Sequence, residues 1–422
     1  MIPVLRAQFN RMFAPERYDH LQDWLEQRCG ARVEFRVAET PIFVPKAMLD
    51  EMAALGADLA KVLIGWPAYL EAAHRAIPTG YRIWGESKHP NFLTADFALV
   101  RDSGGKLVPR LVEIQAFPSV YGYQAVLGNG YRACFGLDPA LGMYLSGLNE
   151  RSYWDLVCRT VLGTCDPENV VLTEVDPLHQ KTRPDFEVTG QRLGIAVVDI
   201  CTLEAVGNKL HYRNRTGRLT PIHRIYNRAI ADELIARNIR LPFDLTSEWD
   251  VEWAGHPNWY FLISKFSLPW LSRPPNRKEV VPPAVFLKDF LEGSGRKELE
   301  AAGVELPREE GADTIYRNLL LKPLFSFAGK GIQFDTTRAE LEAIPASRRD
   351  EFLVQQRMEF VPTIETPCGP TQAEIRILYL WPDRQTLTPA LSLVRLGRGK
   401  MMGVDHNKNQ EWVGASAAFF PA

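Results

Sequence analysis

The sequence lacks the features that mark membrane, secreted or nucleic-acid-binding proteins. No apolar run approaches the roughly 18 residues that span a membrane. The opening MIPVLRAQFNRMFAPERYDH has neither the continuous apolar core nor the small-residue cleavage site of a secretory signal. The formal net charge is −2, so no basic excess would attract nucleic acid or an anionic lipid surface. We therefore expect neither nucleic acid nor a membrane as a partner.

Cysteine is scarce and never arranged in pairs. The six cysteines form no CxxC motif, which argues against a structural zinc site and against a disulfide framework. Scattered thiols in a chain of 422 residues fit a reducing environment, so we expect a cytoplasmic location. A cysteine nucleophile stays open, although buried inert thiols are much more common.

The best-known nucleotide and hydrolase motifs are missing too. There is no GxxxxGK[ST] loop, no GxGxxG after a strand-like run and no G-x-S-x-G elbow. The composition is nevertheless that of a globular protein, with 46% apolar and 24% charged residues. The length is typical of two or three structural units with a substantial core.

Hydrophobic periodicity divides the first half of the chain. Helical spacing predicts helices at 14–28 and 45–64. Two alternating runs flank the turn DSGGK and predict a β-hairpin over 92–115. Strands followed by a helix then predict a small, mainly parallel sheet, with strands at 170–174, 194–200 and 221–227 and an amphipathic helix at 229–238.

The second half predicts further strands. The run 351–362 is typical of a strand that leaves the core, and 373–382 with 389–398 predict an antiparallel pair; the polar stretch 405–411 predicts a loop. We expect four units in the chain: a helical N-terminal region at 1–90, a unit with the strand pair at 91–150, an α/β unit at 151–250 and a last unit with further lobes at 251–422.

The predicted hairpin carries a candidate metal site. Glu113 and Gln115 lie two residues apart on a strand, so their side chains face the same way. If the turn is centred between Gly104 and Gly105, Asp96 lies opposite Glu113. Three oxygen-bearing side chains would then converge, as a hard cation such as Mg²⁺ requires. The alternative is a solvated hairpin face, but Glu113 sits within the apolar LVEI, where an unpaired carboxylate is costly.

A second segment carries a candidate phosphate clamp. In LLLKPLFSFAGKG at 319–331, Lys322 ends an apolar strand-like run that leads into a small, glycine-containing turn. A buried lysine needs an anion, and backbone N–H groups in such a turn suit phosphates. The alternative is a salt bridge between Lys322 and a distant carboxylate. Together the two segments predict an enzyme that uses ATP.

These segments resemble those of circularly permuted ATP-grasp proteins, in particular the glutathionylspermidine synthase-like group. The family pattern is an acid in a "DF" strand, an "EIN" strand with a "TPS"-like turn, an "IYRR" strand, a "PxW…NK…LW" stretch, a "KP…G…G" loop and a "YxQ" strand. The corresponding runs here, in the same order, are ADFALV, VEIQAFPS, IHRIYNRAIADEL, HPNWYFLISKFSLPWL, KPLFSFAGKG and FLVQQ. The resemblance covers about residues 90–420.

The resemblance implies an ATP-grasp fold, circularly permuted, with a pre-ATP-grasp α/β domain and a helical N-terminal region. It implies that Asp96, Glu113 and Gln115 hold one or two Mg²⁺ ions. The ATP contacts that it implies come from two lysines, the glycine-containing loop and the hinge strand: Lys265, Lys322, Ser326, Ala328, Gly329, Lys330, Gly331, Gln355 and Gln356.

The chain also departs from the family pattern. Gln115 stands where Asn is usual. Thr94 and Phe327 stand at or near the places of two arginines that would stabilise the transferring phosphoryl group. We expect Lys330, Arg376 or Arg395 to replace those cations. If none does, the chain is a weak or inactive relative.

The activity implied is an ATP- and Mg²⁺-dependent carboxylate–amine ligation through an acyl-phosphate, with release of ADP and phosphate. A peptide, an amino acid or a polyamine are all open as substrates. Alternatives are a kinase-like or ATP-hydrolysing relative and a nucleotide-binding pseudoenzyme. Further candidates, each of lower weight, are Arg224, Arg228 and Arg376 for an acidic substrate, Asp405 with Asn407 as a second oxygen pair, and His406 as a base or ligand.

Overall fold

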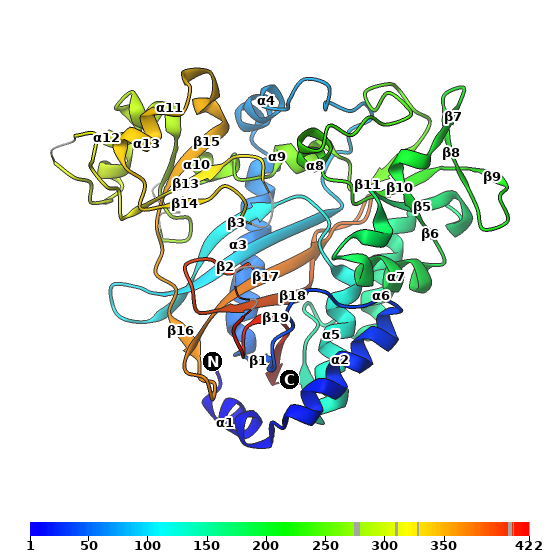
Figure 1. Cartoon of the computed structure of the whole chain (residues 1–422), viewed down its shortest axis with the longest axis horizontal. Helices are drawn as coiled ribbons and strands as arrows, with labels where there is room; N and C mark the ends of the chain where they lie inside the picture. The colour runs from blue at the N-terminus through cyan, green and yellow to red at the C-terminus, as the bar shows by residue number, and fades with distance from the viewer. Residues whose placement is uncertain (274–278, 309–310, 327–328, 404–406, 408, 422) are drawn as a thin grey trace.

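The computed structural model describes residues 1–273, 279–308, 311–326, 329–403, 407 and 409–421 (Figure 1). Its N-terminal segment is helical, as predicted, with α1 (Pro3–Met12), α2 (Pro15–Cys29), α3 (Lys46–Ile64) and α4 (Pro67–Arg75). The predicted helices 14–28 and 45–64 match α2 and α3 to within one residue at each end. None of the helices in the described ranges has the length and apolarity needed to cross a membrane.

The central sheet combines strands from distant parts of the chain. Its order is β19 (Gly414–Ser416), β18 (Thr388–Gly397), β17 (Thr371–Leu380), β2 (Phe92–Arg101) and β3 (Leu107–Gln115), all antiparallel. The short β16 (Pro362–Ile364) pairs with the start of β17. The predicted hairpin and the predicted antiparallel pair 373–382 with 389–398 are therefore confirmed, and they lie side by side in one sheet (Figure 1).

The hairpin contains a bulge that the sequence did not predict. Asp96 lies opposite Glu113, as expected, but near the turn Arg101 pairs with Leu107, a register one residue shorter. The register shifts between Asp96 and Phe97, which leaves Val112 as the extra residue on β3. A bulge disrupts the hydrogen-bond ladder locally and re-aims the neighbouring side chains. The polar residues of β3 follow directly after it.

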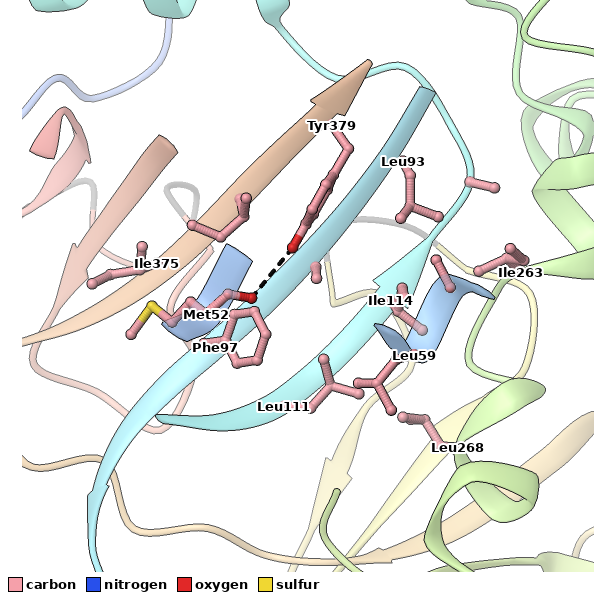
Figure 2. Packing of buried hydrophobic residues seen from close by; sticks show 14 of the residues in the cluster. Met52, Leu59, Leu93, Phe97, Leu111, Ile114, Ile263, Leu268, Ile375 and Tyr379 are labelled. Carbon is pink, nitrogen blue, oxygen red and sulfur yellow. Dashed lines mark hydrogen bonds between the residues drawn. The ribbon is translucent and has the colours of Figure 1, made fainter. Parts of the chain in front are cut away.

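One face of the central sheet is apolar and is covered by α3. Phe97, Leu111, Ile114 and Ile375 belong to the same buried cluster as residues of α3 (Figure 2). Tyr379 is fully buried, and its hydroxyl donates to the backbone oxygen of Ala53, with an O–O distance of 2.9 Å. The alternation of side chains along each strand places the polar residues on the opposite face.

That opposite face is only partly covered, by helix α5 (Tyr121–Phe135). The hydroxyl of Tyr121 donates to the backbone oxygens of Leu93 and Tyr379, and the amide of Gln124 donates to those of Ser392 and Ser416. Leu378, Leu380 and Leu391 share an apolar cluster with α5. The charged residues of the sheet lie on the part of this face beyond α5.

The predicted α/β unit is present, with one more strand than expected. Its described strands all run parallel, in the order β11 (Glu252–Ala254), β10 (Arg224–Asn227), β5 (Val170–Glu174) and β6 (Ala196–Asp199). The sequence predicted three of these strands and missed β11. Helices α6 (Glu150–Leu162) and α7 (Arg183–Leu193) belong to this unit, and β7 (Glu204–Val206), β8 (Lys209–Arg213) and β9 (Leu219–Pro221) form a separate antiparallel sheet.

The predicted helix 229–238 is shorter in the structure. Helix α8 spans Ala231–Ala236, because Ile230 before it is extended and Asn238 after it has a φ of 50°. A left-handed residue ends a helix, and asparagine accepts that conformation better than most residues. The amphipathic pattern therefore overestimated the helix at both ends.

A second, smaller sheet faces the central one. Its antiparallel order is β12 (Ala284–Phe286), β15 (Phe352–Gln356), β13 (Leu319–Pro323) and β14 (Gln333–Phe334). The helices around it are short: α9 (Asn258–Leu262), α10 (Ser267–Ser272), α11 (Leu287–Leu291), α12 (Ser294–Ala301) and α13 (Arg338–Glu342). A last sheet joins β1 (Ile42–Phe43), β20 (Ala418–Pro421) and β4 (Leu141–Gly142).

The predicted strand 351–362 is divided between two sheets. Its first part is β15 of the small sheet, and its end reaches β16 beside the central sheet, while residues 357–361 join the two. The run is strand-like throughout, but its two ends pair with different partners. Of the predicted loop 405–411, residues 405, 406 and 408 lie outside the described residues.

Close approach of α3 to the sheet generates a stability prediction. A Cβ atom on Gly56 would lie 2.2 Å from the Tyr379 hydroxyl oxygen and 2.9 Å from the Ala95 Cβ. We expect Gly56→Ala to lower the free energy of unfolding by about 1–3 kcal/mol through overpacking, measured by urea denaturation. Tyr379→Phe removes the closest atom, so the double variant should be less destabilised than the sum of the singles. Gly56→Ala with unchanged stability would contradict this packing.

Candidate functional site

A cavity of about 850 Å³ lies between the central sheet and the small sheet. The polar face of the central sheet contributes Glu113 and Gln115 from β3, Glu374 and Arg376 from β17 and Arg395 from β18, while β13 of the small sheet contributes Lys322. The loop after β3, the segment after β15 and the segment after β18 add further lining residues. The structure thus brings together residues from both of the segments that the sequence singled out.

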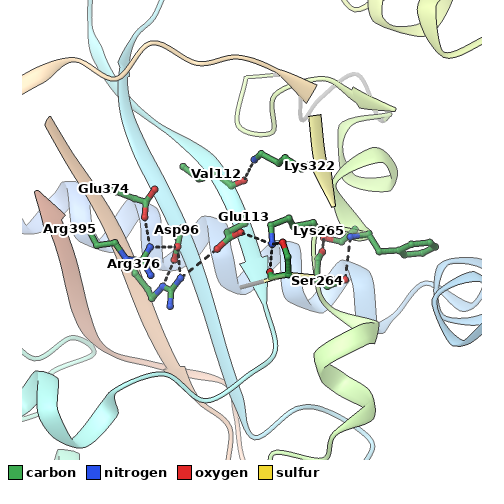
Figure 3. A network of polar contacts seen from close by, with 12 residues as sticks. Asp96, Val112, Glu113, Ser264, Lys265, Lys322, Glu374, Arg376 and Arg395 are labelled. Carbon is green, nitrogen blue, oxygen red and sulfur yellow. Dashed lines mark hydrogen bonds and ion pairs between the residues drawn. The ribbon is translucent and has the colours of Figure 1, made fainter. Parts of the chain in front are cut away.

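Asp96 is the most completely paired group of the site. Its Oδ1 accepts from Nε of Arg376 at 2.5 Å, and its Oδ2 accepts from Nη2 of Arg376 at 2.6 Å and from Nη1 of Arg395 at 3.0 Å (Figure 3). Arg376 lies directly across from Asp96 in the sheet, so the backbone register itself brings the pair together. Burial alone would raise the pKa of Asp96, but the two guanidinium groups hold it below its usual value.

Glu374 extends this network to a second carboxylate. It lies across from Arg395 in the sheet, and the two side chains form an ion pair. Burial raises the pKa of Glu374, an effect that Arg395 opposes. Burial has the opposite effect on Arg395: it would lower the pKa of the guanidinium group, but the nearby carboxylates of Glu374 and Asp96 raise that pKa above its usual value. Two carboxylates and two guanidinium groups therefore form one cluster of matched charge, in which Asp96, Glu374 and Arg376 are buried and Arg395 is partly exposed (Figure 3).

Glu113 is held more loosely than Asp96. Its carboxylate lies 3.5 Å from Nζ of Lys265 and 3.6 Å from Nη2 of Arg376. It is 17% exposed, against 2% for the side chain of Asp96, and it lines the cavity. Gln115 lines the cavity on the same strand and face. Glu113 is thus the carboxylate of this group with the greatest freedom to take a new partner.

The bulge explains how Lys322 is accommodated. Val112, the extra residue of the bulge, offers its carbonyl oxygen to Nζ of Lys322 at 3.3 Å (Figure 3). Lys322 is 3% exposed, and its burial lowers its pKa to about 8, although Glu113 opposes this shift. A lysine beside a cavity with so low a pKa is a good anion partner when protonated and is easily deprotonated otherwise.

Lys265 lies behind Glu113 and does not line the cavity. Its Nζ donates to the backbone oxygen and to the hydroxyl of Ser326, and its side chain is 1% exposed. Ser326 begins the glycine-containing turn, so Lys265 ties this turn to β3 through Glu113. Lys265 thus forms an ion pair with Glu113, whereas Lys322 feels the charge of Glu113 without contacting it and binds the carbonyl of Val112.

The glycine-containing turn has the backbone that its sequence suggests. Gly329 and Gly331 have φ angles of 72° and 75°, a region that favours glycine. Gly329 lines the cavity, and a Cβ on it would lie 2.4 Å from Cε of Met401. Lys330 is exposed and is not part of the lining. Phe327 and Ala328, both singled out from the sequence, lie outside the described residues.

The two glutamines expected at the adenine hinge are not in the large cavity. Gln355 is fully buried, and its amide donates to the backbone oxygen of Pro282 at 3.4 Å. Gln356 lines a smaller cavity of about 440 Å³. The large cavity is instead lined by the residues that follow, Arg357 to Phe360. The adenine contacts expected of Gln355 and Gln356 stay a prediction, while the residues just after them in the chain lie on the wall of the large cavity.

Arg228 connects the site to the α/β unit. Its Nη1 donates to the backbone oxygen of Ser119, in the loop after β3, and lies 3.1 Å from Oδ2 of Asp185 on α7. Asp185 also accepts from the backbone N–H of Tyr123 in the first turn of α5, at 3.0 Å, a favourable place for a carboxylate. Ser119 in turn accepts from Arg376, at 3.3 Å. The loop is therefore fixed from two sides.

The other arginine and polar-loop candidates have different surroundings. Arg224 is buried in ion pairs with Glu252 and Asp383 and is not part of the cavity lining, so its role is structural. Asn407 is buried, and its amide donates to the backbone oxygens of Met401 and Gly403. It thereby supports a segment that lines the cavity. Asp405 and His406 lie outside the described residues.

The predicted magnesium ligands fit a cation in part. Glu113 and Gln115 offer a carboxylate and an amide oxygen toward the cavity, which suits a Mg²⁺ ion that takes its other ligands from phosphates and water. Asp96 fits less well, because arginines contact both of its oxygens. Within the described ranges, no group of three or more His, Cys, Asp or Glu side chains could hold a metal by itself.

Sequence reasoning missed several lining residues. Glu374 carried a signal, because it stands two residues from Arg376 in a strand-like run and therefore shares its face. Arg398, Met401 and Met402 also line the cavity, but they follow a strand in a polar segment without a pattern of its own. Thr94, at the place of a family arginine, is buried and lies across from Gln115.

Comparison with known proteins identifies the fold. No family model matches this chain, and no curated protein does. A candidate gamma-glutamylcysteine synthetase from Methylobacillus flagellatus is 12% identical, with a TM-score of 0.38 over 85% of each chain, which is too low to support an argument. A glutathione synthetase-like effector from Globodera pallida is 10% identical, with a TM-score of 0.57 over 96% of each chain. The chain therefore has a fold similar to that of a glutathione synthetase-like protein.

Proposed function

We propose that the protein is an ATP- and Mg²⁺-dependent ligase that joins a carboxylate to an amine through an acyl-phosphate and releases ADP and phosphate. The observation that carries this proposal is the convergence of Glu113, Lys322, Arg376 and Arg395 in one cavity between two sheets. The likeness of the fold to a glutathione synthetase-like effector supports it.

The order of the strands supports a circularly permuted ATP-grasp fold. The hairpin β2–β3 precedes the small sheet in the chain, and β17 and β18 follow it, yet all four pair in the central sheet. The central sheet is thus built from segments on both sides of the proposed nucleotide-binding lobe. This is the arrangement that the resemblance in the sequence implies.

The charges in the cavity suit phosphoryl transfer to a carboxylate. Lys322 and the guanidinium groups of Arg376 and Arg395 would neutralise the charge that develops on the transferring group. Arg376 and Arg395 would thereby supply the positive charge of the two arginines of the family pattern, at or near whose places this chain has Thr94 and Phe327. Glu113 and Gln115 would hold Mg²⁺, which supplies further neutralisation of phosphate charge. Exclusion of water from the occupied site would limit hydrolysis of the acyl-phosphate.

Substrates would enter on the side of the α/β unit. Ser119, Thr182 and Arg228 line that part of the cavity, so the acid would bind near Arg228. The acceptor would be an amine; a peptide, an amino acid and a polyamine all stay open on either side of the reaction.

A second candidate is a nucleotide-binding protein without turnover. The complete pairing of Asp96 by arginines favours it, because an active relative of the family pattern would use this acid for a metal. One assay separates the two: ADP release with Mg·ATP across a matrix of small carboxylates and amines. ADP that appears only with a specific acid–amine pair supports the ligase, while nucleotide binding without ADP formation supports the second candidate.

We expect Lys322→Met to weaken nucleotide binding by about 10- to 100-fold, as the loss of a charged contact worth about 1.5–3 kcal/mol predicts. Isothermal titration calorimetry with an ATP analogue would measure the change. Lys288→Met is the matched control, because Lys288 is a half-exposed lysine of the same lobe. Equal affinities for the wild type and Lys322→Met would contradict the clamp.

Nucleotide affinity should also depend on pH. An anion binds the protonated form of Lys322, whose pKa in the free protein is about 8. Binding is therefore undiminished well below that pH and weakens as the pH rises through it, until the higher pKa of the bound form is reached. Titrations from about pH 7 to about pH 9 would show the decline. Lys322→Arg keeps its charge throughout, and its affinity should stay constant over this range.

Glu113→Gln should lower the rate of ADP formation by about 100-fold or more, because it removes the proposed carboxylate ligand of Mg²⁺. The substitution is nearly isosteric, so the fold should persist, as circular dichroism would verify. Glu342→Gln, on the exposed helix α13, is the control and should leave the rate unchanged. A fully active Glu113→Gln protein would place the metal elsewhere.

A further inference from the structure

We propose that Asp96 is the counterion of Arg376 and Arg395 and not a ligand of a divalent cation. The two arginines then supply the positive charge that a second metal ion would otherwise bring to the cavity. The part of this inference that concerns bound nucleotide rests on the function proposed above. Its consequence is a site that takes one divalent cation per nucleotide, through Glu113 and Gln115.

The carboxylate of Asp96 is already occupied by arginine. Arg376 contacts both oxygens of Asp96 in a two-pronged arrangement, and Arg395 adds a third contact at 3.0 Å. The residue is 1% exposed. Three of the roughly four lone-pair sites of the carboxylate are thus filled by arginine, and a metal ion at the remaining site on Oδ1 would lie directly beside the guanidinium group of Arg376.

The charges around Asp96 offset one another. Asp96 and Glu374 carry two negative charges, and Arg376 and Arg395 carry two positive charges, in one network of which only Arg395, at 22%, is appreciably exposed. A divalent cation added beside Asp96 would face both guanidinium groups at short range in a poorly screened environment. Displacing either arginine instead would leave a buried, uncompensated charge, which is strongly unfavourable.

The backbone register places the partners of these ion pairs at opposed positions of the sheet. Arg376 lies across from Asp96, and Arg395 lies across from Glu374, in adjacent antiparallel strands. Partners at directly opposed positions of a sheet meet without any movement of the chain. The register therefore keeps the backbones of both arginines beside Asp96, and only a change of side-chain rotamer could separate the charges while the central sheet is intact.

Glu113 differs from Asp96 on each of these points. Its contacts with Lys265 and Arg376 are longer, at 3.5 and 3.6 Å, and its side chain is more exposed. It also lies on the cavity wall together with Gln115, whereas Asp96 does not line the cavity. The geometry therefore separates the two acids of the hairpin into a cation ligand, Glu113, and an arginine anchor, Asp96.

The first test counts metal ions. Mn²⁺ would be titrated into wild-type protein saturated with a non-hydrolysable ATP analogue, with free Mn²⁺ followed by electron paramagnetic resonance. We expect one Mn²⁺ per chain; two would overturn the inference.

Asp96→Asn should bind Mn²⁺ as the wild type does, and Glu113→Gln should bind it about 10-fold more weakly or worse. A Mn²⁺ affinity lowered in Asp96→Asn but not in Glu113→Gln would also overturn the inference. Glu71→Gln, in an exposed pair with Arg75, is the control.

The second test needs no nucleotide. Urea unfolding of the wild type, Asp96→Asn, Arg395→Met and the double variant would measure whether the two residues stabilise each other. We expect each single variant to unfold at lower urea, the two effects to be non-additive, and Mg²⁺ to change none of the midpoints. A Mg²⁺-dependent rise in the wild-type midpoint that Asp96→Asn abolishes would overturn the inference. Failure of the wild type to bind any nucleotide would contradict the proposed function, while this test would still decide the role of Asp96.

Discussion

The ion pairing of four charged side chains, three of them buried, on one face of the central sheet is the constraint on which the arrangement of the site depends. A buried charge must be paired, and Asp96, Glu374, Arg376 and Arg395 are paired only when β2, β17 and β18 lie in this order and register. The opposite face of the sheet is apolar and is buried against α3. The charges thus favour this pairing of strands over others, and the apolar face adds buried hydrophobic area.

Coupling between the two sheets runs through the bulge of the hairpin. The bulge frees the carbonyl of Val112 for Lys322 of the small sheet, and the next residue, Glu113, meets Lys265. Lys265 in turn is bonded to Ser326 at the start of the glycine-containing turn. A regular hairpin would pair the backbone of Val112 with its neighbouring strand and would leave Lys322 without this acceptor. One inserted residue therefore links the lobe that would bind the nucleotide to the sheet that would bind the metal.

The sequence predicted what local patterns determine. Asp96 opposite Glu113 follows from a turn and two alternating strands that are adjacent in the chain. The pairing of Asp96 with Arg376 joins residues 280 positions apart, and no local pattern carries that register. The resemblance placed Gln355 and Gln356 at the adenine hinge without deciding between them, because which face of a strand looks into a cavity depends on how two sheets pack. The parallel strand β11 was missed because three residues are too few to show a period.

The same separation in sequence has a consequence for how the protein is made. During synthesis, α3 and the hairpin β2–β3 emerge first, and β17 follows only after a delay on the order of tens of seconds at ordinary translation rates. Until then, one edge of β2 has no partner strand, and unpaired edges invite association with other chains. Asp96 lies in the middle of that edge strand and stays ionised in water. A charge that points inward from an edge strand discourages such pairing, so the carboxylate that later anchors two arginines also protects the unfinished sheet.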